Sequence, residues 1–137
     1  MILRTYHEKD FAQLSQLWLE SGVGSPARND TQETIRECLR IGGALFLIED
    51  QNEIIGSAWI TYDGRRFYLH HMAVSPLRQN QGIGKMLMDK VIAFGKEHKT
   101  QMKLEVNRQN ARAIHLYEKY GFGNLGEYDT YIIRQYK

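Results

Sequence analysis

Apolar residues recur along this chain with two periods, and each period predicts a different kind of element. Alternation, or a short apolar run bounded by turn residues, predicts strands over residues 2–6, 44–49, 53–62, 67–74 and 102–106. A repeat near 3.6 residues predicts helices over residues 10–20, from 83 onward and over 111–120. Residues 21–29 are expected to form a loop. Residues 125–135 are expected to form one or two further short strands.

Turn signals between these elements predict how the strands pair. Asp30 to Glu33 has the spacing of a capping box, which predicts a short helix over residues 30–40 that ends at the glycine pair 42–43. Residues 50–52 and 63–64 are tight turn signals, so consecutive strands are expected to form an antiparallel meander. A strand–helix–strand unit then follows. The fold class is therefore α+β, a mixed but mostly antiparallel sheet with about four helices, in one domain over residues 1–137.

Composition places the chain among ordinary globular proteins. It has 137 residues, of which 42% are apolar and 25% charged. No apolar run approaches the roughly 20 residues of a membrane span, and the first residues lack a signal-peptide pattern, so we expect a cytoplasmic protein with no membrane partner. The single cysteine, Cys38, is interpreted as a small core residue. No His, Cys and carboxylate residues share metal-ligand spacing, so no metal is expected.

Charge is distributed unevenly between the two halves. Residues 1–63 hold 5 Lys or Arg against 10 Asp or Glu, a net of −5, whereas residues 64–137 hold 13 against 6, a net of +7. A basic half suits a polyanionic ligand and an acidic half suits a cationic one such as an amine. Chance clustering on a solvated surface is the alternative. Nucleic acid is not expected as a partner, because the basic residues do not form an aromatic-interleaved patch.

The segment from residue 67 to 98 combines a strand, a polar turn with glycines and an amphipathic helix. The first N–H groups of such a helix lack intrahelical partners, and glycines let a phosphate approach the backbone, so this arrangement predicts an anion site. It is not a dinucleotide fingerprint, because Leu87 stands where the third glycine belongs. Nor is it a P-loop, since Met86 follows Gly84-Lys85 in place of Ser or Thr.

Gln79, Gly82 and Gly84 fit the pattern Q/R-x-x-G-x-G/A, which resembles the pyrophosphate loop of the GNAT family of N-acetyltransferases. A second motif strengthens this resemblance. The family pattern N-x-x-A-x-x-x-Y-x-x-x-G-F is filled at every place by Asn110, Ala113, Tyr117, Gly121 and Phe122. The resemblance covers residues 67–122 well. The first third of the chain agrees only in the order of its elements.

This resemblance implies a fold, a cofactor and a mechanism. It implies a sheet with a splayed strand pair and acetyl-coenzyme A (acetyl-CoA) as donor. Tyr117 would be the general acid that protonates the leaving thiolate. The cofactor-binding residues that the resemblance implies lie in the strand, the turn and the later helix: Met72, Ala73, Val74, Gln79, Asn80, Gln81, Gly82, Ile83, Gly84, Lys85, Asn110, Ala113 and Tyr117. Arg78 is a further candidate for phosphate.

The general base does not follow the family pattern. Many members carry a glutamate early in the strand before the loop, and here that position is Tyr68. His70 and His71 offer imidazoles that titrate in the useful range, and an unbroken strand places them on opposite faces. Either one could remove the proton from the amine, and both could equally be packing residues. The candidate acceptor-binding residues are Arg28, Asn29, Trp59, Tyr62 and Tyr68, with Asp30 beside them.

The hypothesis is an acetyl-CoA-dependent N-acetyltransferase that transfers an acetyl group directly to a primary amine of a small molecule. The residues around the second motif also resemble acetyltransferases that act on ribosomal-protein N-termini, so a protein α-amine is the first alternative. A non-catalytic acyl-CoA sensor is the second, because the usual glutamate is absent. The sequence does not decide the oligomeric state, and a homodimer is one expected assembly.

Overall fold

The computed structural model of the chain describes residues 1–24 and 26–137. These residues form two compact units, Met1–Glu105 and Val106–Lys137, and each unit is described by itself. The predicted loop over residues 21–29 includes Ser25, which lies outside the described residues. The prediction of one domain over residues 1–137 stays a prediction.

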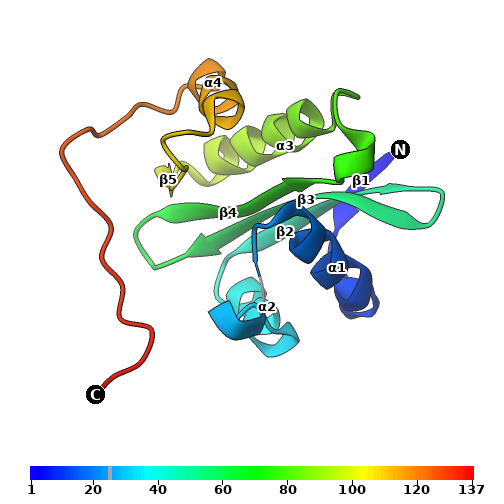
Figure 1. Cartoon of the computed structure of the whole chain (residues 1–137), viewed down its shortest axis with the longest axis horizontal. Coiled ribbons are helices and arrows are strands. Elements are labelled where there is room, and N and C mark those ends of the chain that lie inside the picture. Colours follow the sequence, from blue (N-terminus) through cyan, green and yellow to red (C-terminus); the bar gives the residue numbers. More distant parts are fainter. Residues whose placement is uncertain (25) are drawn as a thin grey trace. The chain divides into compact units, whose positions relative to one another are not determined.

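The first unit is built on a five-stranded sheet with the order β1-β2-β3-β4-β5 (Figure 1). Neighbouring strands pair antiparallel, except β4 and β5, which pair in parallel. The predicted meander and the mixed sheet are therefore confirmed. The strands are β1 Ile2–Thr5, β2 Ala44–Asp50, β3 Glu53–Tyr62, β4 Phe67–Val74 and β5 Met102–Leu104.

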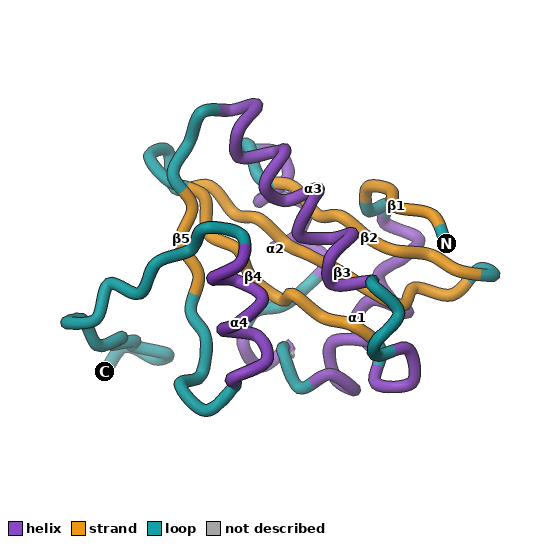
Figure 2. The backbone as a smooth tube through the Cα atoms, turned by 90° about the horizontal axis from the view of Figure 1, so that it is seen from above, coloured by secondary structure: helices purple, strands orange, loops and turns teal. Residues whose placement is uncertain are grey.

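Three α-helices cover the two faces of this sheet, α3 on one face and α1 with α2 on the other (Figures 1 and 2). Ring contacts fix the assignment, because Phe94 of α3 packs on Phe67 of β4, whereas Trp18 of α1 stacks on Trp59 of β3. The helices are α1 Phe11–Ser21, α2 Gln32–Arg40 and α3 Ile83–His98. Short 3-10 turns lie at Glu8–Asp10, Pro26–Arg28 and Pro76–Arg78.

The start of α3 lies very close to the sheet, because β3 carries a glycine under it. A Cβ built on Gly56 would lie 2.8 Å from Ile83 Cγ2 and 3.2 Å from Leu87 Cδ1, which is tighter than ordinary contact. Ile83 and Leu87 are themselves fully buried. Burial of such aliphatic side chains contributes about 1.5–3 kcal/mol each. Gly56 therefore helps to fix the height of the helix start, and with it the turn that precedes the helix.

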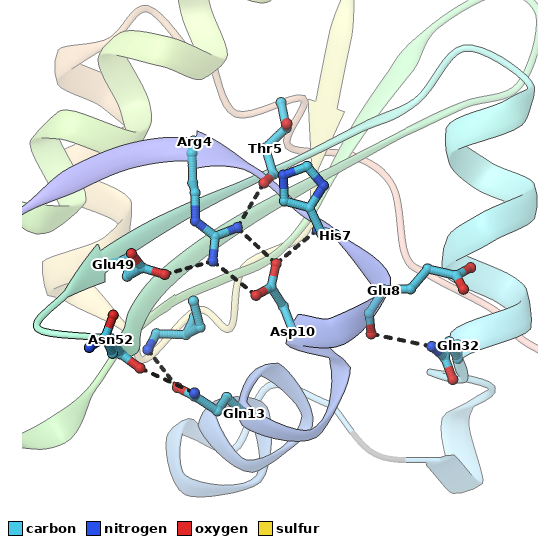
Figure 3. A network of polar contacts seen from close by, with 10 residues as sticks. Arg4, Thr5, His7, Glu8, Asp10, Gln13, Gln32, Glu49 and Asn52 are labelled. Carbon is cyan, nitrogen blue, oxygen red and sulfur yellow. Dashed lines mark hydrogen bonds and ion pairs between the residues drawn. The ribbon is translucent and has the colours of Figure 1, made fainter.

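A polar network attaches α1 to the sheet (Figure 3). Arg4 of β1 donates to both carboxylate oxygens of Asp10, at 2.8 and 2.9 Å, and to Glu49 at 2.8 Å. The backbone N–H of His7 also donates to Asp10, at 2.8 Å. The hydrogen bond from Arg4 lowers the pKa of the Asp10 carboxyl. One helical turn further on, the Gln13 side chain contacts the β2–β3 hairpin. Its Nε2 donates to Asn52 O, and its Oε1 accepts from the Ile54 N–H.

The second helix begins at Gln32, two residues later than the sequence predicts. Thr31, not Asp30, is the N-cap, and its hydroxyl accepts a hydrogen bond from the Thr34 N–H at 3.2 Å. Either residue type is a good cap, so the pattern alone does not choose between them. Asp30 is instead buried, with 5% of its surface exposed, and its carboxylate has another partner.

The second unit holds α4, Ala111–Lys119, and a long C-terminal segment. Gly121 follows the helix at φ 98°, which agrees with the predicted cap. The prediction of strands over residues 125–135 is wrong, because no strand is found in the described residues after Leu104. Strands need a paired neighbour, and here the apolar side chains stay exposed, among them Leu125, Tyr131, Ile132 and Ile133. β5 is also shorter than predicted and ends at Leu104.

Candidate active site

A β-bulge interrupts β4 at its two histidines. Between the pairs Trp59↔His70 and Ser57↔Ala73, β4 advances three residues while β3 advances two. His71 takes up the extra residue with φ 47°, a left-handed conformation that a non-glycine residue rarely adopts. Such backbone costs about 1–3 kcal/mol and is typical of functional sites.

The bulge reverses which face each later side chain occupies. Phe67 packs on α3, yet Ala73, six residues on, belongs to the core cluster under α1. The prediction that His70 and His71 lie on opposite faces is therefore wrong. Both rings contact Trp59, and their centroids are 6.2 Å apart. The extra residue brings two imidazoles to the face covered by α1 and α2.

A buried serine holds the bulge in place. Ser57 is fully buried in β3, and its hydroxyl donates to the carbonyl oxygen of His71 at 2.8 Å. The Ser57 hydroxyl oxygen in turn accepts a hydrogen bond from Trp18 Nε1 at 2.9 Å. Ser57 thus connects α1, β3 and the strained residue of β4. A serine within an apolar strand was the sequence signal that could have revealed this role.

The strand pair β4–β5 separates just before the bulge. β5 pairs with β4 only from Phe67 to Leu69, and no other described strand pairs with that edge of β4. The Ser75 N–H donates to Ile55 of β3, so alternation directs the N–H groups of Met72 and Val74 toward the unpaired edge. Ala73 lies between them, with its N–H toward β3. The splayed pair that the resemblance implies is present.

The polar turn after β4 is held by side chains at both ends. Gln79 Nε2 donates to Val74 O at 3.0 Å, which ties the turn to the end of the strand. Arg78 donates to Gln81 at 3.1 Å and forms a 2.6 Å ion pair with Asp50 of β2. Arg78 therefore connects the turn to the end of β2, and its hydrogen bond lowers the pKa of the Asp50 carboxyl.

The backbone of this turn prepares the start of α3. Asn80 and Gly82 have positive φ values of 63° and 78°, and a Cβ built on Gly82 meets nothing within 4 Å. Ile83 is the first helical residue, and the Met86 N–H donates to Gly82 O at 3.0 Å. The first N–H groups of a helix have no intrahelical acceptor, and the helix dipole adds partial positive charge there. Lys85 is exposed and pairs with Asp89 at 3.2 Å.

Tyr68 and His70 of β4 form a stacked pair. Their ring centroids are 4.4 Å apart, His70 Nε2 is 2.8 Å from Thr61 Oγ1, and the Tyr68 hydroxyl donates to Glu105. Burial lowers the pKa of His70 to about 4 and raises that of Tyr68. His70 is therefore a weak base at neutral pH. Both rings, with Tyr62, line a shallow pocket of about 290 Å³ at the β3–β4 hairpin.

The remaining predicted acceptor residues lie apart from this pocket. Arg28 and Asn29 are exposed in the α1–α2 loop, and Asn29 has φ 68°. Trp59 is 3% exposed and stacks on Trp18 at 5.4 Å, so it is a core residue whose face supports both histidines. Asp30 follows Asn29 in the same loop, and its Oδ1 is 2.9 Å from His71 Nε2.

The second motif lies in the other unit. Asn110 is the N-cap of α4, and its Oδ1 accepts a hydrogen bond from the Ala113 N–H at 3.2 Å. The Tyr117 ring packs on Phe122 at 5.9 Å in an edge-to-face contact. Burial raises the pKa of the Tyr117 phenol, so the hydroxyl stays protonated at neutral pH and suits a proton donor.

Comparison with known proteins assigns the family. The sequence profile described as "Acetyltransferase (GNAT) family" matches residues 9–122. This chain belongs to the GNAT family of acetyltransferases. It is 32% identical over 124 residues to an acetyltransferase of Pectobacterium atrosepticum, and the aligned region covers 87% of this chain and 85% of that relative. The acyl donor of this family is acetyl-CoA, and the chain is an enzyme of the acetyltransferase class.

Solved structures agree with this GNAT fold. A predicted acetyltransferase from Clostridium acetobutylicum, solved with acetyl-CoA, has a TM-score of 0.76 at 19% identity and covers 96% of this chain and 95% of its own. The ribosomal-protein-S18-alanine N-acetyltransferase of Escherichia coli has a TM-score of 0.75 at 22% identity, covering 89% and 77% respectively. At these identities the likeness establishes the fold alone.

The described residues contain neither a candidate metal cluster nor a helix that could span a membrane. Within residues 1–24 and 26–137, no group of three His, Cys, Asp or Glu side chains could hold a metal ion. Among the same residues, no helix has the length and apolar character that a membrane span requires.

Proposed function

We propose that this GNAT protein is an N-acetyltransferase that passes the acetyl group of acetyl-CoA directly to a primary amine of a small molecule. The observation that carries the proposal is the unpaired edge of β4 beside a glycine turn. Met72 and Val74 turn N–H groups toward that edge, and the turn over residues 79–85 follows it within a few residues.

The donor binds along this edge in the proposal. The turn residues Gln79–Lys85, with the start of α3, take the pyrophosphate through backbone N–H groups. The N–H groups of Met72 and Val74 take the pantetheine arm and the thioester oxygen, with Ala73 between them. The open space above Gly82 supports this assignment, because a phosphate can approach there without displacing a side chain. Asn110 and Ala113 are assigned to the same cofactor on the strength of the second motif.

The chemistry needs a base, an oxyanion site and an acid. The neutral amine attacks the thioester carbonyl carbon, a C–N bond forms, and strand N–H groups stabilise the oxyanion. The C–S bond then breaks, its electron pair stays on sulfur, and the thiolate takes the Tyr117 proton. The attacking amine nitrogen loses one proton to an imidazole of β4, which passes it to solvent, and the Tyr117 phenolate regains its proton from solvent. The products are an N-acetyl amine and free coenzyme A, so no covalent enzyme intermediate is required.

A small amine is favoured as acceptor by the shape of the acceptor side. The depression at Tyr62, Tyr68 and His70 has a volume of about 290 Å³, the scale of a small ligand. A protein α-amine is the second candidate, favoured by the fold likeness to the S18-alanine enzyme. For that substrate the exposed Arg28 and Asn29 are proposed to contact the peptide.

Release of free thiol from acetyl-CoA distinguishes these candidates. The protein is assayed against a panel of small primary amines and against peptides with free N-termini, with product mass confirming the acetylated nitrogen. Turnover with small amines supports the proposal, and turnover with peptides alone supports the second candidate. Calorimetric binding of acetyl-CoA with no turnover for any acceptor would show a sensor and reject both.

A further inference from the structure

His71 is enclosed by groups from three different elements. Its ring makes edge contacts with Trp18 of α1 at 4.5 Å and with Trp59 of β3 at 5.2 Å. Asp30, from the loop before α2, places Oδ1 2.9 Å from Nε2. The side chains of His71 and Asp30 are 13% and 6% exposed, so this is a buried contact between an imidazole and a carboxyl group.

The Nε2 side of the His71 ring is the enclosed side. Nε2 is buried and has no hydrogen bond of good geometry among the described residues, so its 2.9 Å approach to Asp30 Oδ1 is a close but poorly aligned polar contact. Active-site hydrogen bonds are often loose without substrate and tighten when it binds. The 13% of the His71 side chain that is exposed therefore belongs to atoms other than Nε2. The remaining ring nitrogen, Nδ1, is the one considered below as the base.

Gly24 closes the Nε2 side. A Cβ built on this residue would lie 2.5 Å from Asp30 Oδ2 and closer still to His71 Nε2, inside any real Cβ contact. Gly24 has no positive φ, so its lack of a side chain is explained by space and not by backbone conformation. The α1–α2 loop thus supplies both a carboxylate and the backbone surface that presses it against the imidazole.

We propose that Asp30 is a positioning residue for His71, holding the ring by Nε2 so that Nδ1 accepts the proton of the acceptor amine. This inference rests on the proposed acetyl transfer. An ionised carboxylate beside Nε2 favours the neutral tautomer with hydrogen on Nε2, which leaves the Nδ1 lone pair as the base. A carboxylate that orients an imidazole in this way also stabilises the imidazolium formed when the base takes a proton.

The charges that face His71 support this assignment. From the elements packed against the ring, Asp30 and His70 are the titratable neighbours, while α1 and β3 contribute indoles that do not titrate. His70 has a different environment, because its Nε2 lies 2.8 Å from the Thr61 hydroxyl and its ring stacks on Tyr68. Only one of the two imidazoles has a carboxylate beside a ring nitrogen.

The proton path is complete without a further reactant. The amine proton moves to Nδ1, directly or through one water, and His71 becomes an imidazolium with Nε2–H toward Asp30. After product release the Nδ1 proton passes to solvent, which restores the starting tautomer.

The first test reads the tautomer of His71 in the unliganded protein. Long-range proton–nitrogen NMR on uniformly nitrogen-labelled protein should show the neutral ring with hydrogen on Nε2. In Asp30→Asn this preference should fall toward that of an exposed histidine. Asp10→Asn is the matched control, since Asp10 is also a buried, ion-paired carboxylate, at 6% exposure against 5% for Asp30. A neutral wild-type ring with hydrogen on Nδ1 overturns the proposal, and this reading needs no variant to fold.

The second test reads the proton transfer. Asp30→Asn should lower kcat tenfold or more and change KM for the amine less than threefold, and it should move the acid limb of the pH profile to lower pH. Asp10→Asn should change neither. In a His71→Gln background, Asp30→Asn should have no further effect on kcat, because it acts through the ring that is gone. Equal losses from both carboxylate variants overturn the proposal, as does additivity in the double variant.

Failure of this inference is separable from failure of the proposed function. Normal turnover in a folded Asp30→Asn protein rejects the positioning role alone and leaves the acetyltransferase standing. Absence of turnover in the wild-type protein for every amine and peptide rejects the proposed function, and with it the role of Asp30.

Discussion

The hydroxyl of Ser57 donates a hydrogen bond to the main-chain carbonyl of His71, 2.8 Å away, and accepts one from the indole of Trp18. One buried oxygen therefore holds the only residue of β4 with a positive φ among those described. Removing it leaves a buried donor and a buried acceptor unsatisfied at once, and each such loss costs about 1–3 kcal/mol.

Ser57→Ala should accordingly lower the free energy of unfolding by about 2–4 kcal/mol and reduce kcat, because the bulge loses its lateral support. Urea melts and thiol-release kinetics measure the two effects. Ser21→Ala is the control, since the Ser21 hydroxyl is buried without a hydrogen-bond partner and its loss should be neutral or stabilising. A Ser57→Ala protein with wild-type stability would contradict the role of this residue.

Gly82→Asp should abolish coenzyme A binding while the fold survives. The new carboxylate would stand where the pyrophosphate is proposed to lie, and nothing within 4 Å obstructs it in the free protein. Gly64→Asp is matched, because Gly64 also has a positive φ, 89° against 78°, and also faces open space. Titration calorimetry should show a loss of more than about 100-fold for the first variant and little change for the second. Unchanged affinity in Gly82→Asp would reject the loop assignment.

Tyr117→Phe should lower kcat by roughly 10²–10⁴-fold, the usual contribution of a general acid, with little change in coenzyme A affinity. Burial raises the pKa of this phenol, so the wild-type hydroxyl carries its proton throughout the neutral range. Tyr128→Phe, a change at an exposed tyrosine of the same unit, is the control. Wild-type turnover in Tyr117→Phe would mean that the thiolate takes its proton from another source.

His70 should make the folded state less stable in mild acid. Burial lowers its pKa to about 4 in the folded protein, below the ordinary value of 6.5, so the unfolded chain binds a proton first as the pH falls. Stability should therefore decline between pH 6.5 and 4, and His70→Gln should flatten that decline. Urea melts at pH 7 and pH 5 measure it. An identical decline in the variant would show that other groups are responsible.

Local patterns were sufficient for the elements that carry the site. The apolar run of β4, the capping and turn residues, and the glycine turn at Gly82 are short-range signals, and the structure has the strand and helix at the predicted residues. The expected strands of residues 125–135 failed because a strand depends on a neighbour, which alternation within one segment does not supply.

The arrangement around His71 depends on contacts that sequence spacing does not encode. Asp30 precedes it by 41 residues, and the bulge that turns its ring toward Trp18 is held by Ser57 of another strand, whose hydroxyl donates to the His71 carbonyl. A one-residue insertion in strand register reverses the face of every later side chain, so alternation assigned the two histidines to opposite faces. Gly24 indicated a loop but not its contact with His71 and Asp30.

Because β5 pairs with β4 only as far as Leu69, the residues proposed for the donor and those near His71 come from different segments of the chain. Residues proposed to hold the donor follow the bulge, on the end of β4 and the start of α3, whereas Gly24, Asp30 and the exposed Arg28 come from a connection on the opposite face. In the proposed arrangement the surface residues of this connection, such as Arg28, are separate from the donor site, whereas Asp30 in the same connection is tied to the chemistry through His71. The connection can therefore vary at its exposed positions and is constrained at its buried ones.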